Sequence, residues 1–234
     1  MRAGDVLRVS CPFTPARVTD LSPEYVVVRW PWWDVDPDCD WVKWNGEVAL
    51  PTGSASSEWD HDLFRVRPEA QRFAIGATCL VGIPPSVVHV IAVDRFDPPL
   101  ETGRLPRPRR LVTVLRAGLS YNGELEEQGC QLDPDDDIPA SFELLLRPYA
   151  FLRTGDEVAD ATGRAWRFDT PWDWCSFDGG TPDEPTWPLT LLTRGCRGDT
   201  SAAESVAAAT MVGTHQQEVV RWAALTRARP ARLS

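Results

Sequence analysis

The chain has 234 residues, of which 43% are hydrophobic and 25% are charged, and its formal net charge is −10. A chain of this length and composition can bury a substantial core without disulfide or metal support. The negative charge argues against binding to nucleic acid or to anionic membranes, because both need a basic face. The sequence has neither an apolar run as long as a membrane span nor a signal-peptide pattern, so we expect a soluble cytoplasmic protein.

Most of the chain is predicted to form short β-strands. Segments rich in β-branched or aromatic residues are too short for helices, and they lie at residues 24–30, 87–93, 110–115 and 142–146. Twenty-one prolines interrupt any long helix, because proline lacks the backbone N–H. Pro84-Pro85 is expected to lie between strands.

The end of the chain is predicted to be helical. From Ser201 the sequence is rich in alanine, and Ser201 and Glu204 have the spacing of a capping box. A second start of this kind follows Gly213. We therefore expect two short helices, the second of which docks on the β body through Trp222 on its apolar stripe.

A short sequence pattern, which we call the internal echo, occurs twice, once near each end of the β-rich region. Gly4-Asp5 and Gly155-Asp156 each open a β-like stretch, and each stretch runs to a Pro-Trp pair. This pattern predicts two related β units, and chance recurrence is the alternative. The fold class is therefore mainly β, with small barrel-like or sandwich units and a short C-terminal helical segment. The expected organisation is an N-terminal β unit at 1–58, a middle β region at 59–140, a second β unit at 141–198 and a helical tail at 199–234.

Most of the eleven tryptophans fall in two segments that also carry aspartate, residues 30–44 and 166–187, which we call the Trp/Asp elements. An indole face and a carboxylate both attract an ammonium group, so these elements predict a site for a cationic amino-compound. The elements are expected to face each other, and burial of the tryptophans in the core is the alternative. Asp34 or Asp173 is expected to hold or deprotonate the amine. The other residues expected to bind it are Trp32, Trp33, Asp36, Trp172, Trp174 and Asp178.

Two other groups are candidates for chemistry. His89 alternates with valines in an apolar strand, which is typical of a core histidine with satisfied hydrogen bonds, and it is also a candidate base. Arg104 and Arg107 lie in a proline-stiffened loop. Guanidinium groups match two oxygens of a phosphate, sulfate or carboxylate, so this loop is a candidate anion site, with a solvated loop as the alternative.

Several kinds of site are not predicted. The alternating aspartates from Asp34 to Asp40 have the spacing of the first ligands of a calcium-binding loop. The rest of the loop pattern is absent, because Cys39 and Asn45 occupy the positions that require glycine and glutamate. The six cysteines form no C-x-x-C pair, so we expect no metal and no cofactor. Neither a serine-hydrolase motif nor a glycine-rich phosphate loop occurs.

Three parts of the sequence resemble segments of tryptophan-rich actinobacterial proteins of similar length that have no known activity. These parts are residues 31–34 continuing to 44–51, residues 81–85 with 88–90, and residues 147–151 continuing to 172–174. The resemblance spans nearly the whole chain and implies no reaction.

We therefore expect a protein that binds a cationic amino-compound, as a component of a specialised-metabolism pathway. One alternative is a small biosynthetic enzyme in which an amine displaces a leaving group within the same molecule, as in aziridine formation, although no motif matches such enzymes. Another is an interaction module whose tryptophans bury against a protein partner, as a hetero- or homo-oligomer. Trp32 or Trp33 on a flat exposed face would favour the partner, and in a concave acidic pocket they would favour the small molecule.

Overall fold

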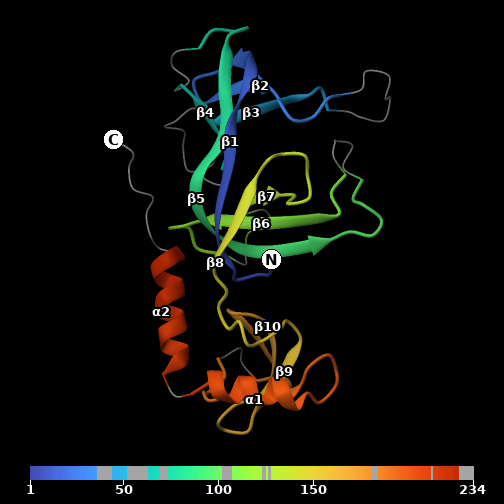
Figure 1. Cartoon of the computed structure of the whole chain (residues 1–234), viewed down its shortest axis with the longest axis vertical. Helices are drawn as coiled ribbons and strands as arrows, with labels where there is room; N and C mark the ends of the chain where they lie inside the picture. Colours follow the sequence, from blue (N-terminus) through green and yellow to red (C-terminus); the bar gives the residue numbers. More distant parts are fainter. Residues whose placement is uncertain are drawn as a thin grey trace.

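The computed structural model describes residues 1–35, 44–51, 63–68, 73–101, 107–122, 125, 128–180, 184–211 and 213–226. The fold is mainly β, with two antiparallel sheets and two helices in a C-terminal segment, as the sequence predicts. Figure 1 shows the larger sheet at one end of the molecule, the smaller sheet with helix α1 at the other, and helix α2 beside the junction. Among the described residues, neither helix is long and apolar enough to cross a membrane.

The larger sheet curls into a half-barrel, in the order β3-β2-β1-β5-β6-β7, with β4 added to β5 and β8 added to β1. Its buried side chains alternate along the strands, as Val26 and Val28 do in β2, because successive residues of a strand point to opposite faces. Its strands are β1 (Val6–Leu21), β2 (Tyr25–Arg29), β3 (Glu47–Pro51), β4 (Arg65–Arg67), β5 (Thr78–Arg95), β6 (Arg110–Arg116), β7 (Cys130–Leu132) and β8 (Ser141–Leu146). They come from the expected units 1–58 and 59–140 and from the start of 141–198.

Strands β2, β6 and β8 lie at predicted positions, but the segment 87–93 is only part of the much longer β5. Pro84 and Pro85 lie inside this strand, which corrects the expectation that they separate strands. They fall between Ile83 and Ser86, where the pairing with β1 shifts its register. On its other side, β5 changes partner there from β4 to β6. Proline is tolerated at such a bulge because the ladder does not need its missing N–H.

The smaller sheet has the order β11-β10-β9-β12, and a second hydrophobic core lies between it and α1. Two helices follow, as predicted, but Asp199 caps the first one in place of the expected Ser201, since its side chain accepts a hydrogen bond from the backbone N–H of Ala202. Gly213, whose φ is +93°, lies between the two helices and directly before the first residue of α2. These elements are β9 (Asp156–Ala159), β10 (Ala165–Thr170), β11 (Asp173–Ser176), β12 (Thr190–Thr193), α1 (Thr200–Ala209) and α2 (Thr214–Thr226).

The echo between Gly4-Asp5 and Gly155-Asp156 corresponds to one turn that occurs twice. Both glycines have a positive φ, of 89° and 85°. In each turn the aspartate accepts a hydrogen bond from the backbone N–H three residues earlier, at 3.0 Å for Asp5 and 2.9 Å for Asp156. Each turn leads into the first strand of an antiparallel meander, β1-β2-β3 or β9-β10-β11. The meanders differ beyond the turn, because β1 also pairs with β5 and β8 whereas β9 also pairs with β12.

Candidate functional site

The described residues of the first Trp/Asp element, 30–35 and 44, pack onto the larger sheet. Trp32 and Trp33 follow the end of β2 and lie half-buried against its core, where the ring of Trp32 is 4.8 Å from that of Trp30. The indole N–H of Trp33 donates to Oδ1 of Asp136 at 2.9 Å. Asp34 is exposed, and the expected ligand Asp36 lies outside the described residues.

The second Trp/Asp element contributes mainly to the smaller core. Trp174 is buried there, and the indole N–H of Trp166 donates to Oδ2 of Asp160 at 3.1 Å. Asp178 is exposed, and both of its oxygens are 2.7 Å from the guanidinium of Arg164, which holds the pKa of Asp178 well below its usual range. Asp173 is exposed at the start of β11. Two tryptophans of these elements, Trp33 and Trp166, therefore donate to aspartates from other parts of the chain.

The two Trp/Asp elements do not come together. Trp32 and Trp33 pack against the core of the larger sheet, and Trp174 belongs to the core of the smaller one. Among the described residues, no ring contact joins the two elements, and β2 and β10 lie toward opposite ends of the molecule (Figure 1). The expected shared site is therefore not formed. Trp172 instead faces helix α2, where its ring lies 6.2 Å from that of Trp222 at an angle of 46°.

A pocket of about 150 Å³ lies where α2 crosses the junction of the two sheets, and we call it the α2 pocket. Its walls come from the linker after β8, the turn between β10 and β11, Glu184, and one face of α2. Aromatic rings, prolines and two carboxylates are thus gathered in one concavity. The lining residues are Pro148, Tyr149, Pro171, Trp172, Glu184, Glu218, Val219 and Trp222.

Contacts with the start of the chain hold the aromatic wall in place. The indole N–H of Trp222 donates to the carbonyl oxygen of Gly4 at 3.2 Å, and its ring makes a T-shaped contact with the ring of His89 at 5.6 Å. This contact confirms that the second helix docks through Trp222. Gly4 packs directly on Pro171, so that a Cβ atom at Gly4 would overlap Cγ of Pro171. The first Gly-Asp turn thereby supports the turn that carries Trp172.

Tyr149 connects the pocket to its surroundings. Its φ is 50°, a backbone conformation that side chains of this size rarely adopt. Its N–H donates to Oε2 of Glu218 at 2.9 Å, and its carbonyl accepts from Arg2 at 2.8 Å. Its hydroxyl lies 2.8 Å from Nδ1 of His215, whose ring stacks on Trp187 at 4.6 Å. These bonds fix a strained residue at the base of the pocket.

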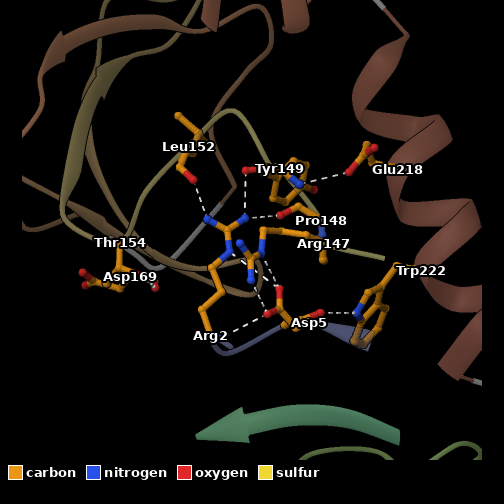
Figure 2. A network of polar contacts seen from close by, with 11 residues as sticks. Arg2, Asp5, Arg147, Pro148, Tyr149, Leu152, Thr154, Asp169, Glu218 and Trp222 are labelled. Carbon is orange, nitrogen blue, oxygen red and sulfur yellow. Dashed lines mark hydrogen bonds and ion pairs between the residues drawn. The ribbon is translucent and has the colours of Figure 1, made fainter. Parts of the chain in front are cut away.

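A buried ion-pair network fixes the linker that carries Pro148 and Tyr149, as Figure 2 shows. Asp5 is completely buried and accepts two hydrogen bonds from Arg147, at 2.8 and 2.7 Å. The guanidinium of Arg2 donates to the carbonyl oxygens of Pro148, Tyr149 and Leu152. Both arginines are therefore directed toward Asp5 and the linker.

The pocket is electronegative. Burial raises the pKa of Tyr149 above its usual range, and the negative charges of Glu184 and Glu218 raise it further. Oε2 of Glu184 also lies 3.5 Å from Nε2 of His215. A tyrosinate would be repelled there, whereas a cation would be attracted.

Comparison of the chain with protein-family models, with curated proteins and with solved structures gives no match. The chemistry of the α2 pocket is therefore inferred from its own residues.

The other candidates from the sequence lie outside this pocket. His89 is buried behind Trp222, and burial lowers its pKa to about 4. Within the described chain its Nδ1 has no hydrogen-bond partner, which corrects the expectation of satisfied hydrogen bonds. In the arginine loop, Arg107 pairs with Glu101 at 2.9 Å, and Arg104 lies outside the described residues. The described residues contain no cluster of metal-binding side chains.

The sequence analysis missed both carboxylates of the pocket. Glu218 lies four residues before Trp222, and this spacing places the two side chains on one face of a helix. That signal was present in the sequence. The meeting of this face with Pro171 and Trp172 depends on the packing of the two sheets, and no local pattern encodes it.

Proposed function

We propose that the protein binds a small organic cation in the α2 pocket. The observation that carries this proposal is the meeting of two indole rings, Trp172 and Trp222, with the carboxylates of Glu184 and Glu218 in one concave site. The proposal keeps the cationic ligand and Trp172 from the sequence analysis. It assigns the anionic role to the two glutamates, because they line the pocket, whereas Asp34 and Asp173 lie outside it.

The chemistry of the walls supports this choice. An ammonium group gains about 0.5–2 kcal/mol from each aromatic face, and the gain is larger where water is excluded. A carboxylate at short range adds a charge-assisted hydrogen bond. A cavity of about 150 Å³ holds a group the size of one benzene ring. Aryl-alkyl amines, short diamines and quaternary ammonium ions satisfy these limits.

The two alternatives have less support. In the enzyme version, a carboxylate holds the amine and the arginine loop receives an anion, but Arg107 does not line the pocket and is paired with Glu101. The interaction module was expected to present Trp32 or Trp33 on a flat exposed face. Both rings are half-buried against the larger sheet instead. We therefore favour binding of a small molecule.

Titration calorimetry and tryptophan fluorescence with phenethylamine, cadaverine and choline test the proposal. At least one of these cations should bind saturably. The double variant Glu184→Gln/Glu218→Gln should weaken binding more than tenfold, because it removes both carboxylates of the pocket, the half-buried Glu218 and the more exposed Glu184.

Asp173→Asn is the matched control. This variant removes a carboxylate from the residue next to Trp172 but outside the pocket, so the affinity should stay within about twofold, because exposed charge pairs contribute little. If none of the three cations binds, or if Asp173→Asn weakens binding as much as the glutamate variants do, the proposal is wrong.

A further inference from the structure

The charges of the α2 pocket also bear on which cations it accepts. We propose that its ligand is an amine without a carboxylate on the carbon that bears the nitrogen, so that the pocket separates amines from the corresponding amino acids. This inference rests on the proposed function, and it adds a discrimination that cation binding alone does not require.

The first argument is the charge of the walls. The lining residues include two carboxylates, Glu184 and Glu218, and no arginine or lysine. An α-amino acid carries its own carboxylate one carbon away from the ammonium. When the ammonium approaches the glutamates, that carboxylate must enter the same small space, where like charges repel.

The second argument is that the walls present few hydrogen-bond donors to a ligand. Pro148 and Pro171 have no backbone N–H. The indole N–H of Trp222 donates to Gly4, and the backbone N–H of Tyr149 donates to Glu218. The hydroxyl of Tyr149 is bonded to His215. Trp172 adds one neutral N–H, which is not enough to replace the hydration of a carboxylate.

The third argument concerns the nearby guanidinium groups of the ion-pair network. Figure 2 shows Arg147 directed at Asp5, and Arg2 directed at the carbonyls of the linker. Asp5 is completely buried, so turning Arg147 toward a ligand would take two hydrogen bonds from a buried carboxylate and leave it only the contacts with Arg2. These arginines therefore do not provide a place for a ligand carboxylate.

Three ligands that share a benzyl group separate the effects of size and charge. Phenethylamine lacks the carboxylate, L-phenylalanine carries it, and L-phenylalaninamide has a neutral amide of nearly the same size in its place. Affinities are measured by calorimetry at pH 6.5, because an α-amino group next to an amide has a pKa of about 7.7–8.0 and all three ligands must carry an ammonium for the comparison. Phenethylamine and L-phenylalaninamide should each bind at least tenfold more tightly than L-phenylalanine.

Two single variants test the assigned cause. Glu184→Gln and Glu218→Gln each remove one charge, and the glutamine oxygen at position 218 can still accept the N–H of Tyr149. In either variant the preference for L-phenylalaninamide over L-phenylalanine should fall at least threefold, because the repulsion is reduced.

The outcomes distinguish this inference from the proposed function. Equal affinity for L-phenylalanine and L-phenylalaninamide would overturn the discrimination and leave cation binding intact. A preference that both glutamine variants retain unchanged would overturn the assignment to the glutamates. A failure of phenethylamine, cadaverine and choline alike to bind would overturn the proposed function and this inference together.

Discussion

Glu218 on α2 accepts a hydrogen bond from the backbone N–H of Tyr149, 2.9 Å from its Oε2, although 69 positions separate the two residues. This bond joins the last helix to the linker between the two sheets. Tyr149 has a positive φ, and such a conformation costs about 1–3 kcal/mol unless its surroundings impose it. Glu218 is therefore both a wall of the α2 pocket and a support for its base.

The two roles of Glu218 are separable by substitution. Glu218→Ala should lower the free energy of unfolding by about 1–3 kcal/mol, because it leaves a partly buried N–H without an acceptor. Glu218→Gln keeps an acceptor and should cost much less, while still weakening cation binding. Urea denaturation measures both variants. An equal loss of stability in the two would show that the charge, and not the hydrogen bond, holds the linker.

Gly4 and Gly155 provide a matched test of the repeated turn. Both have a positive φ near 85–89°, so an alanine at either position costs about 1–2 kcal/mol in backbone strain. A Cβ atom at Gly155 meets nothing within 4 Å, whereas one at Gly4 overlaps Pro171. Gly4→Ala should therefore be clearly less stable than Gly155→Ala in thermal unfolding.

The same two variants also differ in their effect on the pocket. Moving Pro171 displaces Trp172, so only Gly4→Ala should change the affinity for a bound cation. Equal melting temperatures for the two variants would mean that Gly4 does not press on Pro171.

The sequence was sufficient to predict the mainly β fold, the two C-terminal helices and the docking of Trp222, because these depend on local periodicity, on glycine breaks and on a helical stripe. It was not sufficient for β5, where a register shift lets Pro84 and Pro85 stay inside a strand. Local composition reflects neighbours along the chain, and it does not specify which strands pair across a sheet or in which register.

The proposed site shares only Trp172 with the site expected from the sequence. The abundance of tryptophan and acidic residues led to the expectation of a cation site, and of the residues expected there only Trp172 lines the α2 pocket. Several of the expected tryptophans pack in the cores, and the indoles of Trp33 and Trp166 donate to aspartates inside the fold. Glu218 shares a helix face with Trp222, but both meet Trp172 and Glu184 only through long-range packing.

Helix α2 should contribute measurably to stability. Removing the segment after Gly213 takes away Trp222, which covers His89, and the acceptor for Tyr149. Trp222→Ala alone should cost about 2 kcal/mol, below the 3–5 kcal/mol typical of fully buried aromatic residues, because Trp222 is half-buried. The neighbouring exposed Arg221 is the control, and Arg221→Ala should change stability by less than about 0.5 kcal/mol. An unchanged melting temperature after truncation would show that the helix is not docked.

The buried His89 should make stability fall on mild acidification. Burial lowers its pKa from 6.5 to about 4 in the folded protein, so the folded state binds fewer protons than the unfolded state between these values. Stability from this group is complete above pH 6.5 and decreases as the pH falls toward 4, by at most about 3 kcal/mol.

His89→Leu should remove most of the difference in unfolding free energy between pH 7 and pH 4.5. Asp160 does not interfere in this window. Burial alone would raise the pKa of Asp160, but hydrogen bonds from Thr162, Thr186, Arg164 and Trp166 outweigh burial and lower it to about 2. The stability that Asp160 provides is therefore present above its ordinary pKa of 3.8 and is lost only below it. Trp222→Ala, which uncovers the imidazole, should reduce the pH dependence without abolishing it. If wild type and His89→Leu lose the same stability at pH 4.5, the acid sensitivity arises from another group.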